Sequence, residues 1–179
     1  MPLDFELDPP MDEALCTGLI ALWVDVVNAD GAVGFVPPVT QSDVRPRAEQ
    51  IFDDIRSGHT HLVTGRLDEE LVGFCFLEQR IGPLFAHWAT IKRIQIHPDL
   101  QGRGLGSGLL EATEEHARRL GLDALHLTVR GGTGRESFYA RHGYKIVGRI
   151  PKTIRVGPGD DREEIYMVKG LADAAAPST

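Results

Sequence analysis

Residues 94–107 read Ile-Gln-Ile-His-Pro-Asp-Leu-Gln-Gly-Arg-Gly-Leu-Gly-Ser, and this stretch decides the fold of the chain around it. The alternating run over residues 91–96 predicts a strand, which ends at Pro98 because proline has no N–H to donate to a sheet. Four glycines then fall within seven residues, and apolar residues recur at helical spacing from Leu105 to Leu120. The sequence therefore predicts a strand, a glycine-rich turn and a helix, in that order.

A turn of this kind leaves backbone N–H groups unpaired at a helix N-terminus, where the helix dipole also favours negative charge. Glycines keep side chains away from these amides, so a phosphate or pyrophosphate can reach them. Spacing excludes two common phosphate loops. A Walker A loop needs a lysine that is absent here, and Ser107 or Leu109 stands where a dinucleotide fingerprint needs its third glycine.

The segment Gln101-Gly102-Arg103-Gly104-Leu105-Gly106 resembles the acyl-CoA pyrophosphate loop of the GCN5-related N-acetyltransferases, the GNAT superfamily. That resemblance implies an α/β fold with a mixed, mostly antiparallel central sheet flanked by about four helices. It implies acetyl-CoA (coenzyme A) as the cofactor. We expect one GNAT acetyltransferase domain over residues 1–171, and a loose C-terminal tail over residues 172–179, which has too little to bury.

The order of elements read from the whole chain agrees with that resemblance. Asp12 is expected to cap a first helix that ends near Asn28, and a second helix is expected from about Asp43 to Ser57. Expected strands, in order, are 3–7, 61–64, 71–77, 87–96, 125–129, 144–150 and 164–168. A short helix is expected over residues 136–142, and residues 151–163 are expected to form a polar connection.

Composition excludes several classes of protein. The chain has 179 residues, enough for one domain with a sizeable core, and its net charge of −7 argues against a nucleic-acid scaffold. No apolar run is long enough to span a bilayer, and the acidic N-terminus is unlike a secretory signal. Cys16 and Cys75 lie in apolar runs without a C-x-x-C spacing, so we expect buried free thiols and a cytoplasmic location.

The resemblance assigns cofactor contacts to two adjacent stretches. Ile94, Gln95 and Ile96 would run along the pantetheine arm through their backbone. The loop would surround the pyrophosphate with Gln101, Gly102, Arg103, Gly104, Leu105, Gly106 and Ser107. Arg103 would add positive charge there, although a solvated surface position is the alternative.

A second motif, Phe138-Tyr139-Ala140-Arg141-His142-Gly143-Tyr144, resembles the family's Phe/Leu-Tyr-x-x-x-Gly-Phe/Tyr signature. In that signature the tyrosine, here Tyr139, protonates the departing thiolate, which a phenol with a pKa near 10 can do at neutral pH. A core tyrosine with a satisfied hydroxyl is the alternative. Ser137 in the same segment is a further expected cofactor contact, whereas Gly132 replaces an asparagine that is frequent in the family.

The general base is the weakest part of the pattern. The chain is nearest in look to the tabtoxin-resistance type of acetyltransferase, whose two carboxylates would fall on Thr90 and Thr128. Threonine cannot act as a base, so the mechanism of that type does not transfer. His126 shares a strand face with Thr128 at a spacing that one water could bridge, and its pKa near 6.5 suits a base. A structural histidine is the alternative.

The sequence predicts an N-acetyltransferase that moves an acetyl group from acetyl-CoA to a primary amine of a small molecule by direct attack. The alternatives are a catalytically silent acyl-CoA-binding module and a protein N-acetyltransferase. The expected partner is a small-molecule amine; no nucleic acid and no membrane are expected, and a homodimer stays open. No metal site is expected, since His59 and His61 are only two ligands on one predicted strand and are read as surface residues. His116, among charged residues of a predicted helix, is likewise read as solvated.

Overall fold

The computed structural model describes residues 3–171, so the C-terminal tail expected over residues 172–179 lies outside the described residues. The described chain has four α-helices and seven strands. In order they are β1 (Asp4–Leu7), α1 (Glu13–Asn28), α2 (Gln41–Arg56), β2 (Thr60–Leu67), β3 (Glu70–Gln79), β4 (Trp88–Ile96), α3 (Leu105–Arg119), β5 (Ala124–Arg130), α4 (Glu136–Arg141), β6 (Lys145–Gly157) and β7 (Asp160–Gly170). None of the described helices is both long and apolar enough to cross a membrane.

The sheet order is β1-β2-β3-β4-β5-β7-β6. β4 and β5 are parallel, whereas β1 with β2, β2 with β3, β5 with β7 and β6 with β7 are antiparallel. The expected mixed, mostly antiparallel sheet with about four helices is confirmed. The chain divides into two compact units, residues 3–79 with 91–116, and residues 80–90 with 117–171, and each is described by itself below.

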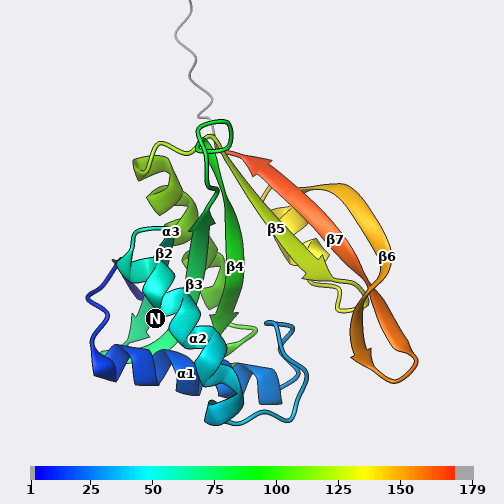
Figure 1. Cartoon of the computed structure of the whole chain (residues 1–179), viewed down its shortest axis with the longest axis horizontal. Helices are drawn as coiled ribbons and strands as arrows, with labels where there is room; N and C mark the ends of the chain where they lie inside the picture. The colour runs from blue at the N-terminus through cyan, green and yellow to red at the C-terminus, as the bar shows by residue number, and fades with distance from the viewer. Residues whose placement is uncertain (1–2, 172–179) are drawn as a thin grey trace, which may run out of the picture. The chain divides into compact units, whose positions relative to one another are not determined.

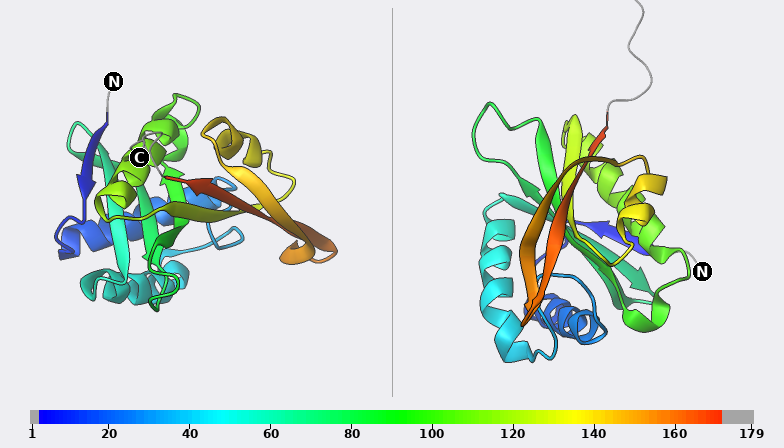
Figure 2. Two further views of the ribbon diagram at one scale, coloured as in Figure 1. Left: turned by 90° about the horizontal axis from the view of Figure 1, so that it is seen from above. Right: turned by 90° about the vertical axis from the view of Figure 1, so that its right-hand side faces the viewer.

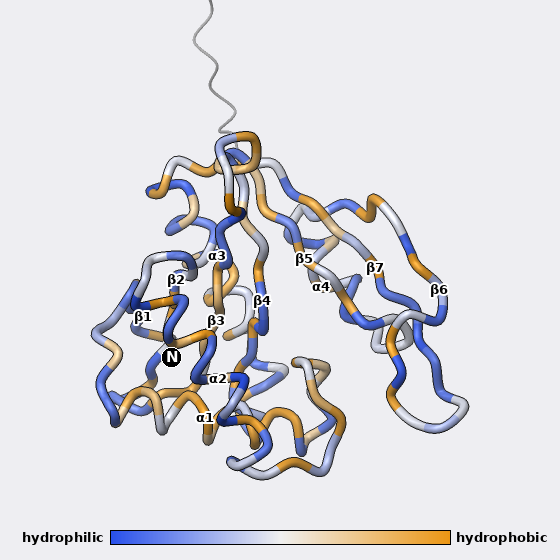
Figure 3. The backbone as a smooth tube through the Cα atoms, in the orientation of Figure 1, coloured by the Kyte–Doolittle hydropathy of each residue, from blue (hydrophilic) through white to orange (hydrophobic). Residues whose placement is uncertain are grey.

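In the first unit, α1 and α2 pack on one face of β2 and β3 (Figure 1). Figure 3 shows hydrophobic residues along α1 and β3, and the core between helices and sheet is supplied mainly by α1 and α2. Trp23, Phe74 and Phe76 are large side chains in this core, each at most 1% exposed, and their rings contact one another edge-on or tilted. Aromatic packing of this kind adds to the area that the rings bury.

Local capping signals set both N-terminal helices. The Asp12 carboxylate accepts from the Leu15 N–H at 2.7 Å, which confirms the predicted start of α1. α2 begins at Gln41, two residues before the predicted start at about Asp43, because Thr40 is the N-cap residue. Asp43 is the third residue of the helix, and its carboxylate accepts from the Thr40 N–H at 2.8 Å, as in a capping box.

The opposite face of the first unit's sheet meets α3, as Figure 2 shows from two further sides. A Cβ at Gly73 of β3 would lie 2.5 Å from Ile96 Cδ1 and 3.4 Å from Leu109 Cδ2, so only glycine lets these elements approach. Cys75 is fully buried here, and burial raises the pKa of its thiol to about 12. His116 is only 8% exposed, which corrects the expectation of a surface side chain.

In the second unit, β5, β7 and β6 form an antiparallel sheet with α4 against β6. The predicted polar connection over residues 151–163 is wrong, because most of it belongs to β6 and β7. These strands stay paired out to Gly157 and Asp160, with three register shifts along the way. Pairing satisfies the backbone here, and the bidentate ion pair between Arg155 and Asp161 suits the solvated end of the hairpin.

Candidate active site

The glycine-rich turn lies in the first unit, between the end of β4 and the start of α3. Gly102 and Gly104 have φ values of +75° and +81°, which side chains rarely tolerate, and a Cβ at either position would meet no protein atom within 4 Å. Of the described residues, none accepts a hydrogen bond from the amides of residues 102–106, while the Ser107 N–H donates to the Gly104 carbonyl at 3.0 Å. Among the described residues the turn therefore offers a run of amides without a protein acceptor, at positions where the glycines leave open space.

Two side chains of the loop bond back to the protein. The Gln101 amide donates to the Ile96 carbonyl at 3.0 Å, which ties the loop to the end of β4. The Arg103 guanidinium donates to the Asp99 carbonyl at 3.2 Å, and the side chain is otherwise exposed. Gln101 therefore holds the loop in place, and Arg103 keeps most of its donors accessible at the surface.

The strand before the loop carries the other expected cofactor residues. Ile96 and Gln95 are 6% and 5% exposed, and Ile94 is half-buried. Both polar atoms of the Gln95 side chain are buried without a partner in the described chain, which is costly for an amide. The pairing of β4 with β5 falls on Trp88–Thr90, in the second unit.

Arg93 lies between these residues and the first helix, and its backbone breaks the regularity of β4. Its φ of +52° marks an irregular turn of the strand. The guanidinium carbon lies 4.7 Å from the centre of the Trp23 ring, and a Cβ at Gly34 would lie 3.4 Å from two guanidinium nitrogens. Burial and the charge of Arg47 lower the pKa of Arg93 to about 10, so it stays cationic at neutral pH.

The segment after α1 packs on Trp23 and passes close to Arg93 at Gly34. The Trp23 indole N–H donates to the Val33 carbonyl at 2.9 Å, and the Trp23 ring meets Phe35 edge-on at 5.6 Å between centroids. The loop over residues 29–39, whose Val33, Phe35 and Val39 are apolar, thus packs on the core of the first unit. The half-buried guanidinium thus lies against one aromatic ring and next to Gly34. No local pattern predicts this contact, because Trp23, Gly34 and Arg93 are far apart along the chain.

In the second unit, α4 confirms the short helix of the Tyr139 motif and ends before Gly143, whose φ is +88°. Tyr139 is half-buried and meets the rings of Phe138 and Tyr144 edge-on, at 5.1 Å and 5.8 Å between centroids. Ser137 on the same helix is exposed. Two aromatic contacts thus hold the Tyr139 ring in place.

His126 lies on β5, as predicted, on the face opposite the buried residues Leu125, Leu127 and Val129. Its ring stacks on Tyr166 at 5.6 Å between centroids and meets Trp88 edge-on at 5.9 Å. The register pairs His126 with Thr90 across the parallel strands. The imidazole and Thr90 therefore lie opposite each other in the second unit, with two aromatic rings against the imidazole.

A carboxylate that sequence reasoning missed lies on the same face of this sheet. Thr128 pairs with Tyr166 and Arg130 pairs with Glu164 across β5 and β7, and directly opposed residues share a face. The Tyr166 hydroxyl donates to Glu164 Oε2 at 2.8 Å, and this bond raises the pKa of Tyr166. The Glu164-x-Tyr166 spacing indicates a shared strand face, but only the register with β5 places Glu164 near Thr128, one of the two positions where the resemblance would put a carboxylate.

The structure gathers the predicted residues in two groups. Residues 94–96 and the loop adjoin in the first unit, and Ser137, Tyr139 and His126 belong to the second. The roles assigned to these residues stay predictions.

Comparison with known proteins bears on the whole chain. Residues 16–144 match the model of the acetyltransferase (GNAT) family. A relative from Pseudomonas aeruginosa, an L-methionine sulfoximine/L-methionine sulfone acetyltransferase, is 27% identical over 138 residues, which cover 75% of this chain and 77% of the relative.

Solved structures share the fold at lower identity. The ribosomal-protein-alanine N-acetyltransferase of Brucella melitensis superposes with a TM-score of 0.76 at 19% identity, covering 94% of this chain and 99% of that one. The yncA protein of Salmonella typhimurium, solved with acetyl-CoA, gives a TM-score of 0.76 at 17% identity and covers 99% of both chains. With more than half of its length matched by the family model, this chain belongs to the acetyltransferase (GNAT) family.

Proposed function

We propose that this protein transfers the acetyl group of acetyl-CoA to the primary amine of a small molecule that also carries a carboxylate. The observation that carries the proposal is the run of amides over residues 102–106, which have no protein acceptor among the described residues and stand at the start of α3. A pyrophosphate satisfies such amides, and the dipole of a helix of this length favours its charge.

The loop fits the cofactor in three respects. Gly102 and Gly104 leave open space where side chains would otherwise stand. Gln101 fixes the loop to β4, so little order has to be gained when a ligand binds. Arg103 supplies charge beside the amides. We assign the pyrophosphate to residues 101–107, and the pantetheine arm to the backbone of Ile94, Gln95 and Ile96.

Acetyl-CoA supplies an activated acetyl thioester, and the protein has to manage two protons. We assign Tyr139 as the acid for the departing thiolate, because aromatic contacts hold its ring and a phenol keeps its proton at neutral pH. We keep Ser137, which is exposed on the same helix, as a cofactor contact.

The amine must lose a proton before it attacks. His126 is the proposed base, since an imidazole titrates near neutral pH. Stacking on Tyr166 and an edge-on contact with Trp88 hold the His126 ring in place. Glu164, which lies on the same sheet face and accepts from Tyr166, is the second candidate for that role.

Arg93 supports the choice of acceptor. The Arg93 guanidinium is half-buried and cationic at neutral pH, its Nε has no partner among the described residues, and a carboxylate forms the strongest pair with arginine. The Pseudomonas aeruginosa relative acts on methionine sulfoximine and methionine sulfone, two amino-acid analogues. We therefore place the acceptor among amino acids and their analogues, on this comparison rather than on the resemblance to the tabtoxin-resistance type.

The experiment is an acetyl-CoA-dependent screen that pairs each amino acid with its decarboxylated amine. We expect turnover with the acid of a pair and much less with the amine. Arg93→Gln should raise KM for the acid by about 10- to 100-fold, the scale of one charge-assisted hydrogen bond, without changing the affinity for acetyl-CoA. Arg45→Gln, an exposed arginine on α2, is the control.

Equal turnover of acid and amine, with Arg93→Gln and wild type alike, would refute the carboxylate. Binding of acetyl-CoA without turnover of any amine would instead indicate a silent binding module. Acetylation of peptides alone would indicate a protein N-acetyltransferase.

A further inference from the structure

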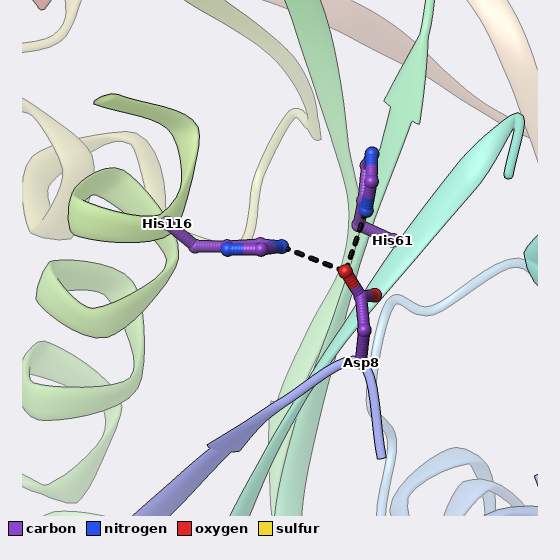
Figure 4. A group of neighbouring side chains, drawn as sticks. All are labelled: Asp8, His61 and His116. Atoms are coloured by element: carbon purple, nitrogen blue, oxygen red, sulfur yellow. Dashed lines mark hydrogen bonds and ion pairs between the residues drawn. The ribbon is translucent and has the colours of Figure 1, made fainter. Parts of the chain in front are cut away.

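Two histidines and an aspartate from distant parts of the chain meet in the first unit. Asp8 follows β1, His61 is on β2 and His116 is in the last turn of α3 (Figure 4). His61 Nδ1 lies 2.7 Å from Asp8 Oδ2, and His116 Nε2 lies 3.0 Å from the same oxygen. One ligand atom from each residue lies within 4.8 Å of the other two. Both rings point at one carboxylate oxygen.

The cluster is shielded without being sealed. The side chains of His61 and His116 are 14% and 10% exposed, and that of Asp8 is 38% exposed. A small ion can reach the group from the side of Asp8, and the histidines provide partly desolvated nitrogen donors.

We propose that Asp8, His61 and His116 form a binding site for a single zinc ion, with water as the fourth ligand. Two imidazole nitrogens and one carboxylate oxygen are a donor set that zinc takes when one position is left to solvent. At zinc–ligand distances of about 2.0–2.2 Å, tetrahedral ligands stand about 3.3 Å apart. The two separations from Asp8 Oδ2, 2.7 Å and 3.0 Å, therefore need to open by roughly 0.3–0.6 Å. The two ring nitrogens, which lie within 4.8 Å of each other, need to come to the same spacing, so side-chain rotation accompanies binding.

The surroundings already hold two of the three ligands in position. Asp8 Oδ1, the oxygen that faces away from the rings, accepts from the Leu62 N–H at 2.9 Å, which leaves Oδ2 for the ion. His61 Nε2, the ring nitrogen that faces away from Asp8, lies 3.0 Å from Gln79 Nε2. The amide can turn over to accept from this nitrogen once His61 Nδ1 binds metal. Such outer contacts orient metal ligands.

Asp8 itself is held in an unusual backbone conformation. Its φ is +48°, and its N–H donates to the Leu62 carbonyl at 2.8 Å. With the bond from Leu62 back to its side chain, Asp8 is clamped to β2 from both its backbone and its carboxylate. This conformation aims the carboxylate across β2 at α3. Metal bound here would join the N-terminal strand, the hairpin and the helix, so we expect it to stabilise the first unit rather than to take part in acetyl transfer.

The test uses the full chain without a histidine tag, stripped with EDTA and dialysed. Calorimetric titration with ZnCl₂ should give one site per chain, and CoCl₂ should give the intense visible absorption of a four-coordinate ion. Zinc at about a hundredfold excess over its Kd should raise Tm by roughly 5–10 °C. His61→Gln and Asp8→Asn should each weaken binding by at least about 10-fold, the scale for a disturbed metal site.

His59→Gln is the matched control, because His59 is an exposed histidine two residues away that bonds to Ser57 instead. It should bind zinc like the wild type. Melting curves in EDTA establish that each variant is folded. If Asp8→Asn does not fold, His116→Gln replaces it as the second ligand variant. Absence of a stoichiometric site in the wild type, retention of the site in folded His61→Gln, or equal loss in His59→Gln would each overturn the proposal.

Discussion

The pyrophosphate loop allows a sharp test with Gly104→Val. Gly104 has a φ of +81°, a region that costs an L-residue about 1–2 kcal/mol. Since a Cβ there meets no protein atom within 4 Å, the substitution should cost stability through the backbone alone. For a chain of this length we expect Tm to fall by roughly 2–8 °C. The core of the first unit should stay folded.

The loss of cofactor affinity should be far larger than this strain. Each amide that bonds a phosphate contributes about 1.5–3 kcal/mol, as a hydrogen bond to a charged group. If a valine at position 104 removes two such bonds by displacing the backbone, the loss is about 3–6 kcal/mol, or roughly 10²- to 10⁴-fold in Kd.

Gly58→Val separates the two effects. Gly58 has a φ of +78° and an equally empty Cβ position, but it follows α2 and lies outside the loop. Both variants should lose similar stability in thermal melts, and only Gly104→Val should lose affinity for acetyl-CoA in calorimetry. Equal affinity in the two folded variants would refute the assignment of the loop.

Three further predictions concern single side chains. Tyr139→Phe should lower kcat by about 10²-fold with little change in the affinity for acetyl-CoA, and full turnover in steady-state assays would make Tyr139 a packing residue. His126→Gln should lower kcat/KM and remove the acidic limb of its pH profile; a variant that keeps both excludes His126 as the base. Burial raises the pKa of Cys75 from 9.0 to about 12, so the folded protein keeps a proton that the unfolded chain loses, and the resulting stability is complete below pH 9 and lost as pH rises toward 12. Urea unfolding from pH 7 to 10.5 should therefore show a steeper fall above pH 9 for wild type than for Cys75→Ala, and parallel curves would contradict it.

Local signals made much of this fold predictable. The Asp12 cap acts on an amide three residues away, and the hairpin of β2 and β3 closes over two residues with positive φ, Asp68 and Glu69. The glycine-rich loop is likewise a property of consecutive residues, since its free amides follow from the start of a helix. Such features depend on backbone preferences within a few residues, and a sequence displays them directly.

The sequence predicted less well those features that depend on pairing between strands, namely strand ends and register. Residues 151–163 carry the polar residues of a loop, yet β6 and β7 extend through most of them because each strand satisfies the backbone of the other. The pairing of β7 with β5 also places Glu164 opposite Arg130, on the same sheet face as His126. A strand register depends on its partner, and one sequence without its fold does not specify it.

The sequence by itself determined the strand, the loop and the helix that mark this family, because each is written in adjacent residues. Only the tertiary structure decided which side chains meet. Arg93, where the backbone of β4 is irregular, contacts the Trp23 ring of α1. Asp8, His61 and His116 come together from a strand end, a hairpin and a helix. These contacts join residues tens of positions apart, and they exist because burying the apolar faces of the helices and strands fixes all of those elements at once.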